Sequence, residues 1–243
     1  MALIEVKDFK KAFGQKVVHQ GVSFSVDEGT CLALLGGSGA GKSVILRSLI
    51  GLEKPDSGQI IVDGDDITHW EEKQLIEVRK KAAYVFQNGA LFDSMSVFDN
   101  LAYPLREHTN LTEEQVREKV IDVLDDFGLK DSEKLFPAEL SGGMQKRVGI
   151  ARSIVSNPKI VLFDEPTAGL DPFNTRLMQE IILRLKKTGV TSILVTHDLP
   201  TAYAVCDYIC LLRHGRIQSQ GKAEIMQKDP QGLFHKFVAG EDF

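Results

Sequence analysis

Residues 36–43 of this chain read Gly36-Gly37-Ser38-Gly39-Ala40-Gly41-Lys42-Ser43. The stretch fits the pattern G-x-x-x-x-G-K-[ST], and it lies between a compact apolar run at 31–35 and a segment of helical character at 42–50. Glycines let successive backbone N–H groups converge on an anion, and a helix that follows presents its positive end to it. The sequence therefore predicts a strand–loop–helix unit that binds a triphosphate, with Lys42 supplying charge and Ser43 a ligand for Mg²⁺. A glycine-rich turn with an exposed lysine is the plainer interpretation.

Two further apolar runs, at 160–163 and 191–196, have the length and composition of buried strands, and residues 173–187 between them have helical periodicity. Asp171 is expected to cap that helix, and Pro172 suits its first position because proline has no N–H to satisfy. Strands that alternate with helices favour a parallel sheet. We therefore expect a central parallel sheet that carries the phosphate loop.

The rest of the chain divides into two regions of different character. Residues 3–26 alternate apolar and polar side chains, with a turn signal at Phe13-Gly14, which predicts antiparallel strands. Residues 88–156 lack such strands and read as helical, including a helix at 111–127 that starts with a capping box.

The predicted fold class is α/β. The sequence resembles a P-loop NTPase core of the RecA type, with an N-terminal antiparallel β region and an inserted α-helical subdomain. We assign residues 1–243 to one domain, with the core at 1–87 and 157–243 and the helical subdomain at 88–156.

Polar side chains stand where three predicted strands end. Asp164 and Glu165 follow the run at 160–163, His197 follows the next strand, and Gln87 follows residues 83–86. Parallel strands deliver their carboxyl ends to one crevice, where Asp164 can hold Mg²⁺ and Glu165 can activate the attacking water. His197 can reach the γ-phosphate, and Gln87 can contact both the metal and the water. Solvated acids and a structural histidine are the plainer alternatives.

A second motif reads Leu140-Ser141-Gly142-Gly143-Met144. It resembles the signature LSGGQ of the ABC superfamily, with Met144 in place of the usual glutamine. The other motifs follow in the family's order, and the resemblance covers essentially the whole chain. Because serine can cap a helix and the two glycines allow close backbone approach, this helix end offers a second anion site.

The resemblance implies an ATPase that hydrolyses ATP with Mg²⁺ and works as a head-to-tail dimer of two copies. In the family, the signature of one subunit closes over the ATP of the other, so Ser141, Gly142 and Gly143 would serve the partner's nucleotide. Asp171 would lie at the dimer seam. Phe13 stands where family members stack an aromatic ring on adenine, and Phe9 is the competing candidate.

Within the superfamily, residues 85–93 and 97–109, with Met144, resemble the ATPases of Mla-type phospholipid transporters. This resemblance implies a subunit on the cytoplasmic face of the inner membrane that drives phospholipid movement between inner and outer membranes. The implied partners are integral-membrane permease subunits, a lipid-binding MCE-domain protein and, as a further candidate, a small STAS-domain regulator. Apolar residues in 90–105 would form the groove that receives a cytoplasmic helix of the permease.

The composition and charge of the chain argue against several classes of protein. The net charge of −5 argues against a nucleic-acid partner, which needs a concentrated basic surface. No stretch approaches the ~20 apolar residues of a spanning helix, and the N-terminus lacks the pattern of a secretory signal, so we expect a cytoplasmic chain that reaches the membrane through a partner. The three cysteines lack metal-ligand spacing and are expected to be packed, reduced thiols.

Two other classes of function remain open. A non-transport ABC ATPase, acting on nucleic acid or in cofactor assembly, would carry the same catalytic motifs. A small-molecule phosphotransferase would share the phosphate loop and the metal-binding acid, although it would not explain residues 140–143.

Overall fold

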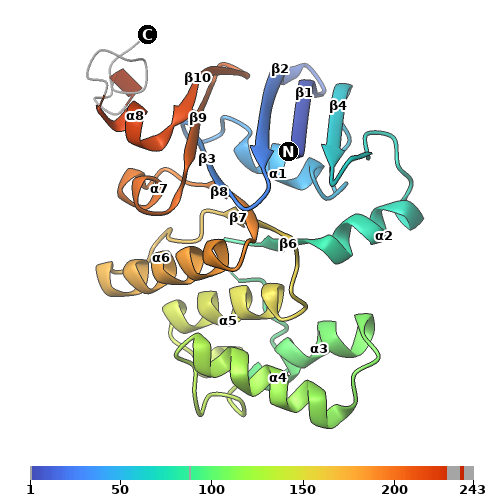
Figure 1. The fold of residues 1–243 in the computed structure, drawn as a ribbon, viewed down its shortest axis with the longest axis vertical. Coiled ribbons are helices and arrows are strands. Elements are labelled where there is room, and N and C mark those ends of the chain that lie inside the picture. Colours follow the sequence, from blue (N-terminus) through green and yellow to red (C-terminus); the bar gives the residue numbers. More distant parts are fainter. Residues whose placement is uncertain (1, 88, 229–235, 238–243) are drawn as a thin grey trace.

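The computed structural model describes residues 2–87, 89–228 and 236–237. Its strands form two sheets (Figure 1). The smaller sheet is antiparallel and contains, in spatial order, β2 (Lys16–Asp27), β1 (Ala2–Phe13), β4 (Ser57–Val62) and β5 (Asp65–Asp66). The larger sheet contains, in spatial order, β10 (Arg216–Lys222), β9 (Tyr208–Arg213), β3 (Cys31–Leu35), β8 (Thr191–Val195), β7 (Ile160–Asp164) and β6 (Ala82–Val85).

The helices lie between and around these sheets. They are α1 (Lys42–Ser48), α2 (Glu72–Lys81), α3 (Val97–His108), α4 (Glu113–Asp126), the 3-10 helix η1 (Pro137–Glu139), α5 (Gly142–Ile154), α6 (Pro172–Lys187), α7 (Leu199–Val205) and α8 (Ala223–Lys228). Helices α3, α4 and α5 gather at the end of the molecule opposite the antiparallel sheet (Figure 1). No helix in the described ranges combines the length and the apolar character needed to cross a bilayer.

The larger sheet is parallel except for β10, which pairs antiparallel with β9. Its central strands are buried on both faces, as parallel sheets require. In β3, Cys31, Ala33 and Leu35 join one apolar core, whereas Leu32 and Leu34 join the other, because successive side chains of a strand point to opposite faces. The sheet therefore separates two cores.

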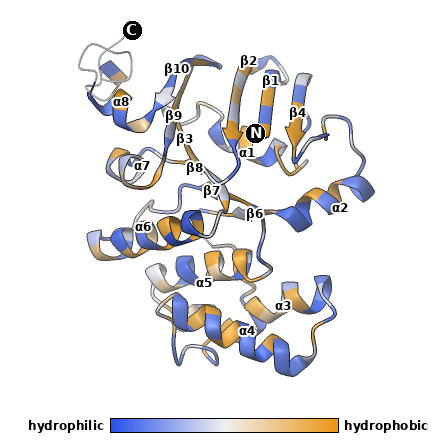
Figure 2. Ribbon diagram, viewed as in Figure 1, coloured by the Kyte–Doolittle hydropathy of each residue, from blue (hydrophilic) through white to orange (hydrophobic). Residues whose placement is uncertain are grey.

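Different helices and strands pack against the two faces of the larger sheet to form the two cores. One core joins the sheet to the apolar faces of α3, α4, α5 and α6, and the other joins it to α1 and the antiparallel sheet. Figure 2 shows hydrophobic and hydrophilic residues mixed along α4, whose buried members Val116, Val120 and Leu124 recur at helical spacing. Each fully buried side chain of this size contributes about 1.5–3 kcal/mol through the hydrophobic effect.

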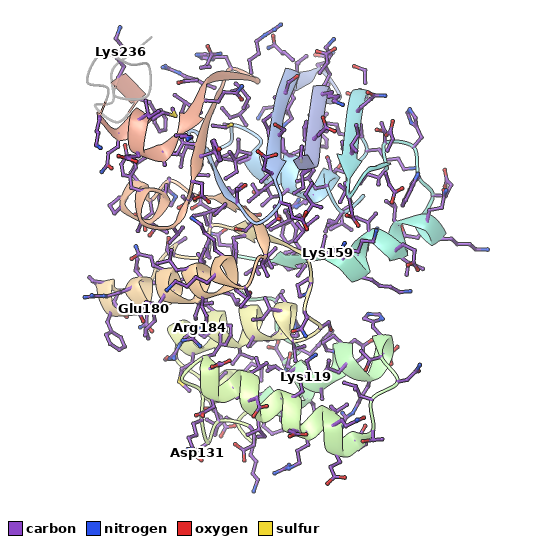
Figure 3. All side chains as sticks on the ribbon, viewed as in Figure 1. Lys119, Asp131, Lys159, Glu180, Arg184 and Lys236 are labelled. Atoms are coloured by element: carbon purple, nitrogen blue, oxygen red, sulfur yellow. The ribbon has the colours of Figure 1, made fainter. Side chains whose placement is uncertain are left out.

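Ion pairs and a hydrogen bond to the backbone link elements at the surface of these layers. Asp63, after β4, lies 2.7 Å from Nζ of Lys81 and 3.5 Å from Nζ of Lys159. Arg184 of α6 donates to the backbone carbonyl of Asp126 at 2.8 Å, which joins α6 to the end of α4; Figure 3 labels both Lys159 and Arg184.

The α/β fold class expected from the sequence is confirmed, with an antiparallel N-terminal sheet of two 12-residue strands joined at Gly14. Asp171 caps α6 and Pro172 opens it, as predicted. The helix predicted at 42–50 ends earlier, at Ser48, because the chain turns through Gly51 at a φ of 70°.

The segment expected to be helical is only partly so. Residues 89–156 contain α3, α4, η1 and α5, but the stretch from 127 to 141 outside η1 is turn and loop. The boundaries at 87/88 and 156/157 stay a prediction, and Met1, Asn88, 229–235 and 238–243 of the predicted domain lie outside the described residues.

Candidate active site

The phosphate loop connects the end of β3 to the start of α1. Gly39 and Gly41 have φ values of 74° and 91°, in the left-handed region that favours glycine. A Cβ placed on Gly37 or Gly39 would meet no atom within 4 Å, so the packing of this chain leaves these positions open. The loop therefore forms a cradle whose glycines admit close approach of an anion to the backbone.

Lys42 lies at the floor of this cradle. Its ammonium donates to the carbonyl oxygens of Gly36 and Gly37, at 2.8 and 3.1 Å, and lies 4.0 Å from Oε1 of Glu165. Burial lowers the pKa of Lys42, and the charges of Glu165 and Asp164 oppose that shift. The lysine is thus a desolvated cation close to two carboxylates.

Asp164 is the last residue of β7, and its side chain is 8% exposed. Ser43 donates its hydroxyl to Oδ1 of Asp164 at 2.8 Å, and Tyr84 of β6 donates to Oδ2 at 2.7 Å. Burial and the adjacent carboxylate raise the pKa of Tyr84, so the phenol remains a hydrogen-bond donor. The predicted metal ligands Ser43 and Asp164 therefore lie side by side.

Glu165 follows Asp164 and has a φ of 53°, which is uncommon for a residue with a side chain. Its backbone N–H donates to the carbonyl of Val195 at 2.9 Å, and this bond fixes the turn beside β8. Oε2 of Glu165 lies 2.8 Å from Nδ1 of His197, which is exposed. Residues with strained backbones cluster at functional sites. The strained backbone of Glu165 directs its carboxylate toward His197, which follows the neighbouring strand β8.

Gln87 follows β6, the edge strand beside β7, and its side chain is exposed. The strand order thus brings Gln87, Asp164, Glu165 and His197 to one edge of the sheet, as the sequence predicts.

The signature motif lies on the other side of the sheet. Ser141 caps α5, accepting a hydrogen bond from the N–H of Met144 at 3.3 Å. A Cβ on Gly142 would meet nothing within 4 Å, whereas one on Gly143 would lie 2.7 Å from the Asn174 side chain. Asn174 in turn donates its backbone N–H to Asp171 at 2.9 Å.

The structure therefore joins the signature to Asp171 but not to the phosphate loop. Apolar residues of α5 pack into one core and those of α1 into the other, so the two helices cover opposite faces of the larger sheet.

Phe13 and Phe9 have different environments. Phe9 is fully buried in the core, so its ring is not available to stack on a base. Phe13, at the end of β1, is 46% exposed, and Nζ of Lys11 lies 5.0 Å from the centre of its ring. A cavity of about 610 Å³ nearby is lined by Lys16, Val18 and Gln20 of β2 and by loop residues 37–40.

Comparison with known proteins decides the family. Residues 19–168 match the family model described as ABC transporter. This chain belongs to the ABC transporter family. It is an ATPase subunit of that family, and the phosphate loop, the strand-end acids and the signature all lie within the matched or adjoining residues.

Curated relatives match this ABC ATPase over nearly its whole length. It is 41% identical to a probable ribonucleotide transport ATP-binding protein of Mycobacterium leprae, covering 98% of this chain and 69% of the relative. It is 37% identical to the intermembrane phospholipid transport system ATP-binding protein MlaF of Escherichia coli, covering 98% and 89%. The MlaF protein of Haemophilus influenzae is also 37% identical, with coverage of 98% and 91%.

Solved ABC cassettes share the fold. A dimeric ATP-binding cassette in a post-hydrolysis state, bound to ADP and Pi, superposes with a TM-score of 0.84 and 28% identity, covering 90% of this chain and 98% of that one. The cbiO1 subunit of Clostridium perfringens, part of the cbiONQ transporter complex, gives the same TM-score and identity, covering 98% and 99%.

Two site residues of this ABC ATPase escape sequence reasoning. Tyr84 donates a hydrogen bond to Asp164. In the sequence, the only sign of this role is that a hydroxyl group stands within the apolar run at 83–86. Lys146, one turn into α5, donates to the carbonyl of Ala168, which ties the signature helix to the segment after Glu165. Burial lowers the pKa of Lys146, and the charge of Glu165 opposes the shift.

Proposed function

We propose that this ABC ATPase hydrolyses ATP where Lys42, Ser43, Asp164 and Glu165 meet. The observation that carries the proposal is the arrangement of these four side chains. The Ser43 hydroxyl donates a hydrogen bond to Asp164 at 2.8 Å, and Nζ of Lys42 lies 4.0 Å from Oε1 of Glu165. Lys42 and the loop amides would bind the phosphates. Glu165 would orient and activate the attacking water, and His197, 2.8 Å from that carboxylate, would contact the γ-phosphate.

The donor set also fits Mg²⁺, which prefers hydroxyl, carboxylate, carbonyl and water oxygens. Ser43 would bind the ion directly, Asp164 would hold it through water, and Gln87 would add an amide oxygen. When bound, the ion supplies positive charge against the phosphate oxygens. Tyr84 and Ser43 hold the Asp164 carboxylate in place for that role.

A second copy of the chain would complete each site. Ser141, Gly142 and Gly143 form a helix start that is open at Gly142, and they lie across the sheet from their own phosphate loop. In a head-to-tail dimer they would close over the partner's triphosphate, with Asp171 at the seam. Dimeric cassettes among the structural neighbours support this arrangement. Phe13 would stack on the adenine.

An exposed apolar groove would couple the ATPase to a membrane partner. It has a volume of about 610 Å³, and its lining includes Leu52, Phe86, Phe92 and Tyr103, each between 40% and 50% exposed. Apolar patches of this kind mark protein interaction sites. We propose that it receives the cytoplasmic helix of an integral-membrane permease, and the chain would then lie on the cytoplasmic face of the inner membrane.

The transported substrate is proposed to be phospholipid, moved between inner and outer membranes by an Mla-type complex. The similarity to two MlaF proteins over 98% of this chain supports that choice. The complex would include an MCE-domain lipid-binding protein and, as a further candidate, a STAS-domain regulator.

The test is purification of the tagged chain in detergent from its native membranes, followed by protein and lipid mass spectrometry and an ATPase assay. We expect a multispanning permease, an MCE-domain protein and bound phospholipid, with ATPase activity that Glu165→Gln abolishes. The relative named for ribonucleotide transport defines the competing substrate, and co-purifying ribonucleotide without phospholipid would favour it. Recovery of the chain alone, or ATPase stimulation by DNA, would contradict the transporter proposal.

A further inference from the structure

His19 lies in β2 behind the phosphate loop, and its side chain is 1% exposed. It pairs with Lys11 of β1, and the next residue, Gln20, donates its N–H to the carbonyl of Gly215 at 2.8 Å. The ring of Phe9 meets the imidazole edge-on, with ring centres 5.2 Å apart. The imidazole is thus held in one position between the antiparallel sheet and the loop.

The imidazole has one hydrogen-bond partner among the described residues. Nε2 of His19 lies 3.2 Å from the carbonyl oxygen of Gly41, whereas the buried Nδ1 has no partner there. A carbonyl oxygen only accepts, so Nε2 carries the hydrogen. Burial lowers the pKa of His19, which keeps the ring neutral.

The bonded carbonyl belongs to the peptide that joins Gly41 to Lys42. In a planar trans peptide the C=O and the N–H point in opposite directions. Fixing the Gly41 oxygen therefore also fixes the direction of the Lys42 N–H, an amide of the anion cradle. The same oxygen accepts the N–H of Val44 at 3.0 Å and of Ile45 at 3.3 Å, so it also anchors the first turn of α1.

Besides these two backbone hydrogen bonds, no side chain of Gly41 supports the start of the helix. It stands before α1 with a φ of 91° and contributes no side-chain cap. A Cβ on Gly41 would lie 2.6 Å from Cε1 and Nε2 of His19, so the ring occupies the space behind the loop.

We infer that His19 is a positioning residue for ATP: its Nε2–H holds the Gly41–Lys42 peptide in the orientation that binds phosphate. The inference rests on the proposed function of the loop. It adds a residue outside the loop motif that sets the affinity for the triphosphate without touching it.

The test compares His19→Leu, which keeps an apolar side chain of similar reach without a donor, with His19→Gln, whose amide nitrogen occupies the place of Nε2. Equilibrium ATP binding, KM, kcat and thermal unfolding are measured on the full chain. We expect His19→Leu to weaken ATP binding and raise KM by roughly tenfold, the equivalent of one hydrogen bond, with a smaller change in kcat. His19→Gln should return both values to within about threefold of the wild type.

Equal ATP affinity in the wild type, His19→Leu and His19→Gln would overturn only the proposed role of His19. Equal loss in both variants would also overturn it, because packing rather than the donor would then matter. A wild-type chain that binds no ATP would instead overturn the proposed function. If His19→Leu does not fold, His19→Asn replaces it, since its amide is too short to reach the Gly41 carbonyl, and the same outcomes apply.

Discussion

Oε2 of Glu165 lies 2.8 Å from Nδ1 of His197, and the main-chain N–H of His197 also donates to Oε2, at 3.4 Å. Glu165 directly follows β7, and His197 lies two residues after the end of the neighbouring strand β8. The left-handed backbone of Glu165 turns its carboxylate toward the histidine. The proposed base is therefore positioned by a contact between two strand ends.

Glu165→Gln is expected to keep ATP binding and to lower kcat by at least about 100-fold, because an amide retains the shape of the carboxylate but cannot accept a proton. ATP should then trap a closed dimer. Size-exclusion chromatography with and without ATP, together with phosphate release, checks both effects. Turnover equal to the wild type would remove Glu165 from the role of base.

Lys42→Ala should weaken the binding of ATP, whereas Glu165→Gln should slow its hydrolysis. It removes the buried cation that would face the phosphates and is expected to weaken ATP affinity by at least about tenfold, since hydrogen bonds to charged groups are worth about 1.5–3 kcal/mol. Fluorescent ATP titration measures the affinity, and the Glu165→Gln protein is the matched control. Unchanged affinity would show that the loop amides alone bind the triphosphate.

Tyr84→Phe removes the donor that holds Oδ2 of Asp164 and leaves the ring packing intact. We expect the Mg²⁺ concentration for half-maximal ATPase activity to rise severalfold, because the carboxylate loses one of its two positioning bonds. Stability should change by no more than about 1.5 kcal/mol. Titration of activity with Mg²⁺ tests this, with Tyr208→Phe in β9 as the control. An unchanged Mg²⁺ dependence would leave Ser43 as sufficient support for Asp164.

His19 should contribute a pH dependence to stability. Because burial lowers its pKa below the ordinary value of 6.5, the unfolded chain takes up a proton there first. Stability should therefore fall as the pH drops below about 6.5 and level off, for this group, below the lowered folded pKa. Urea unfolding at several pH values should show a shallower dependence in His19→Gln. Identical slopes for the two proteins would contradict the expectation.

Gly149 of α5 packs against Gly89, the residue two positions after Gln87. A Cβ on Gly149 would lie 2.6 Å from Cα of Gly89, and backbone cannot yield as a flexible side chain can. Gly149→Ala is thus expected to cost about 1–3 kcal/mol in urea unfolding, despite the better helix propensity of alanine. Gly142→Ala, whose Cβ meets nothing, should leave stability nearly unchanged. Similar stability for both variants would mean that the loop at Gly89 can shift.

Part of the site is readable from the sequence because its geometry is local or follows from strand order. Gly36 to Ser43 are contiguous, and the rule that parallel strands end at one edge places Asp164 and Glu165 near His197. Tyr84 was not predicted, because its bond to Asp164 crosses between two strands whose register no local pattern fixes.

The choice between Phe9 and Phe13 shows where sequence reasoning ends. The pairing of β1 with β2 is irregular between Val6 and Phe9 and again between Phe9 and Lys10, and Asp8 has a φ of 46°. Each irregularity changes which side chains face the core, so alternation along β1 does not reveal that Phe9 is buried and Phe13 exposed.

The sequence alone identified the family and predicted the chemistry of the phosphate loop, because contiguous residues and strand ends carry the motifs for both. The tertiary structure alone decided that His19 supports Gly41 and that Tyr84 holds Asp164. Both contacts join residues that are distant in the chain. The first links β2 to the phosphate loop, and the second depends on the register of β6 against β7 in the larger sheet, which no local sequence pattern fixes.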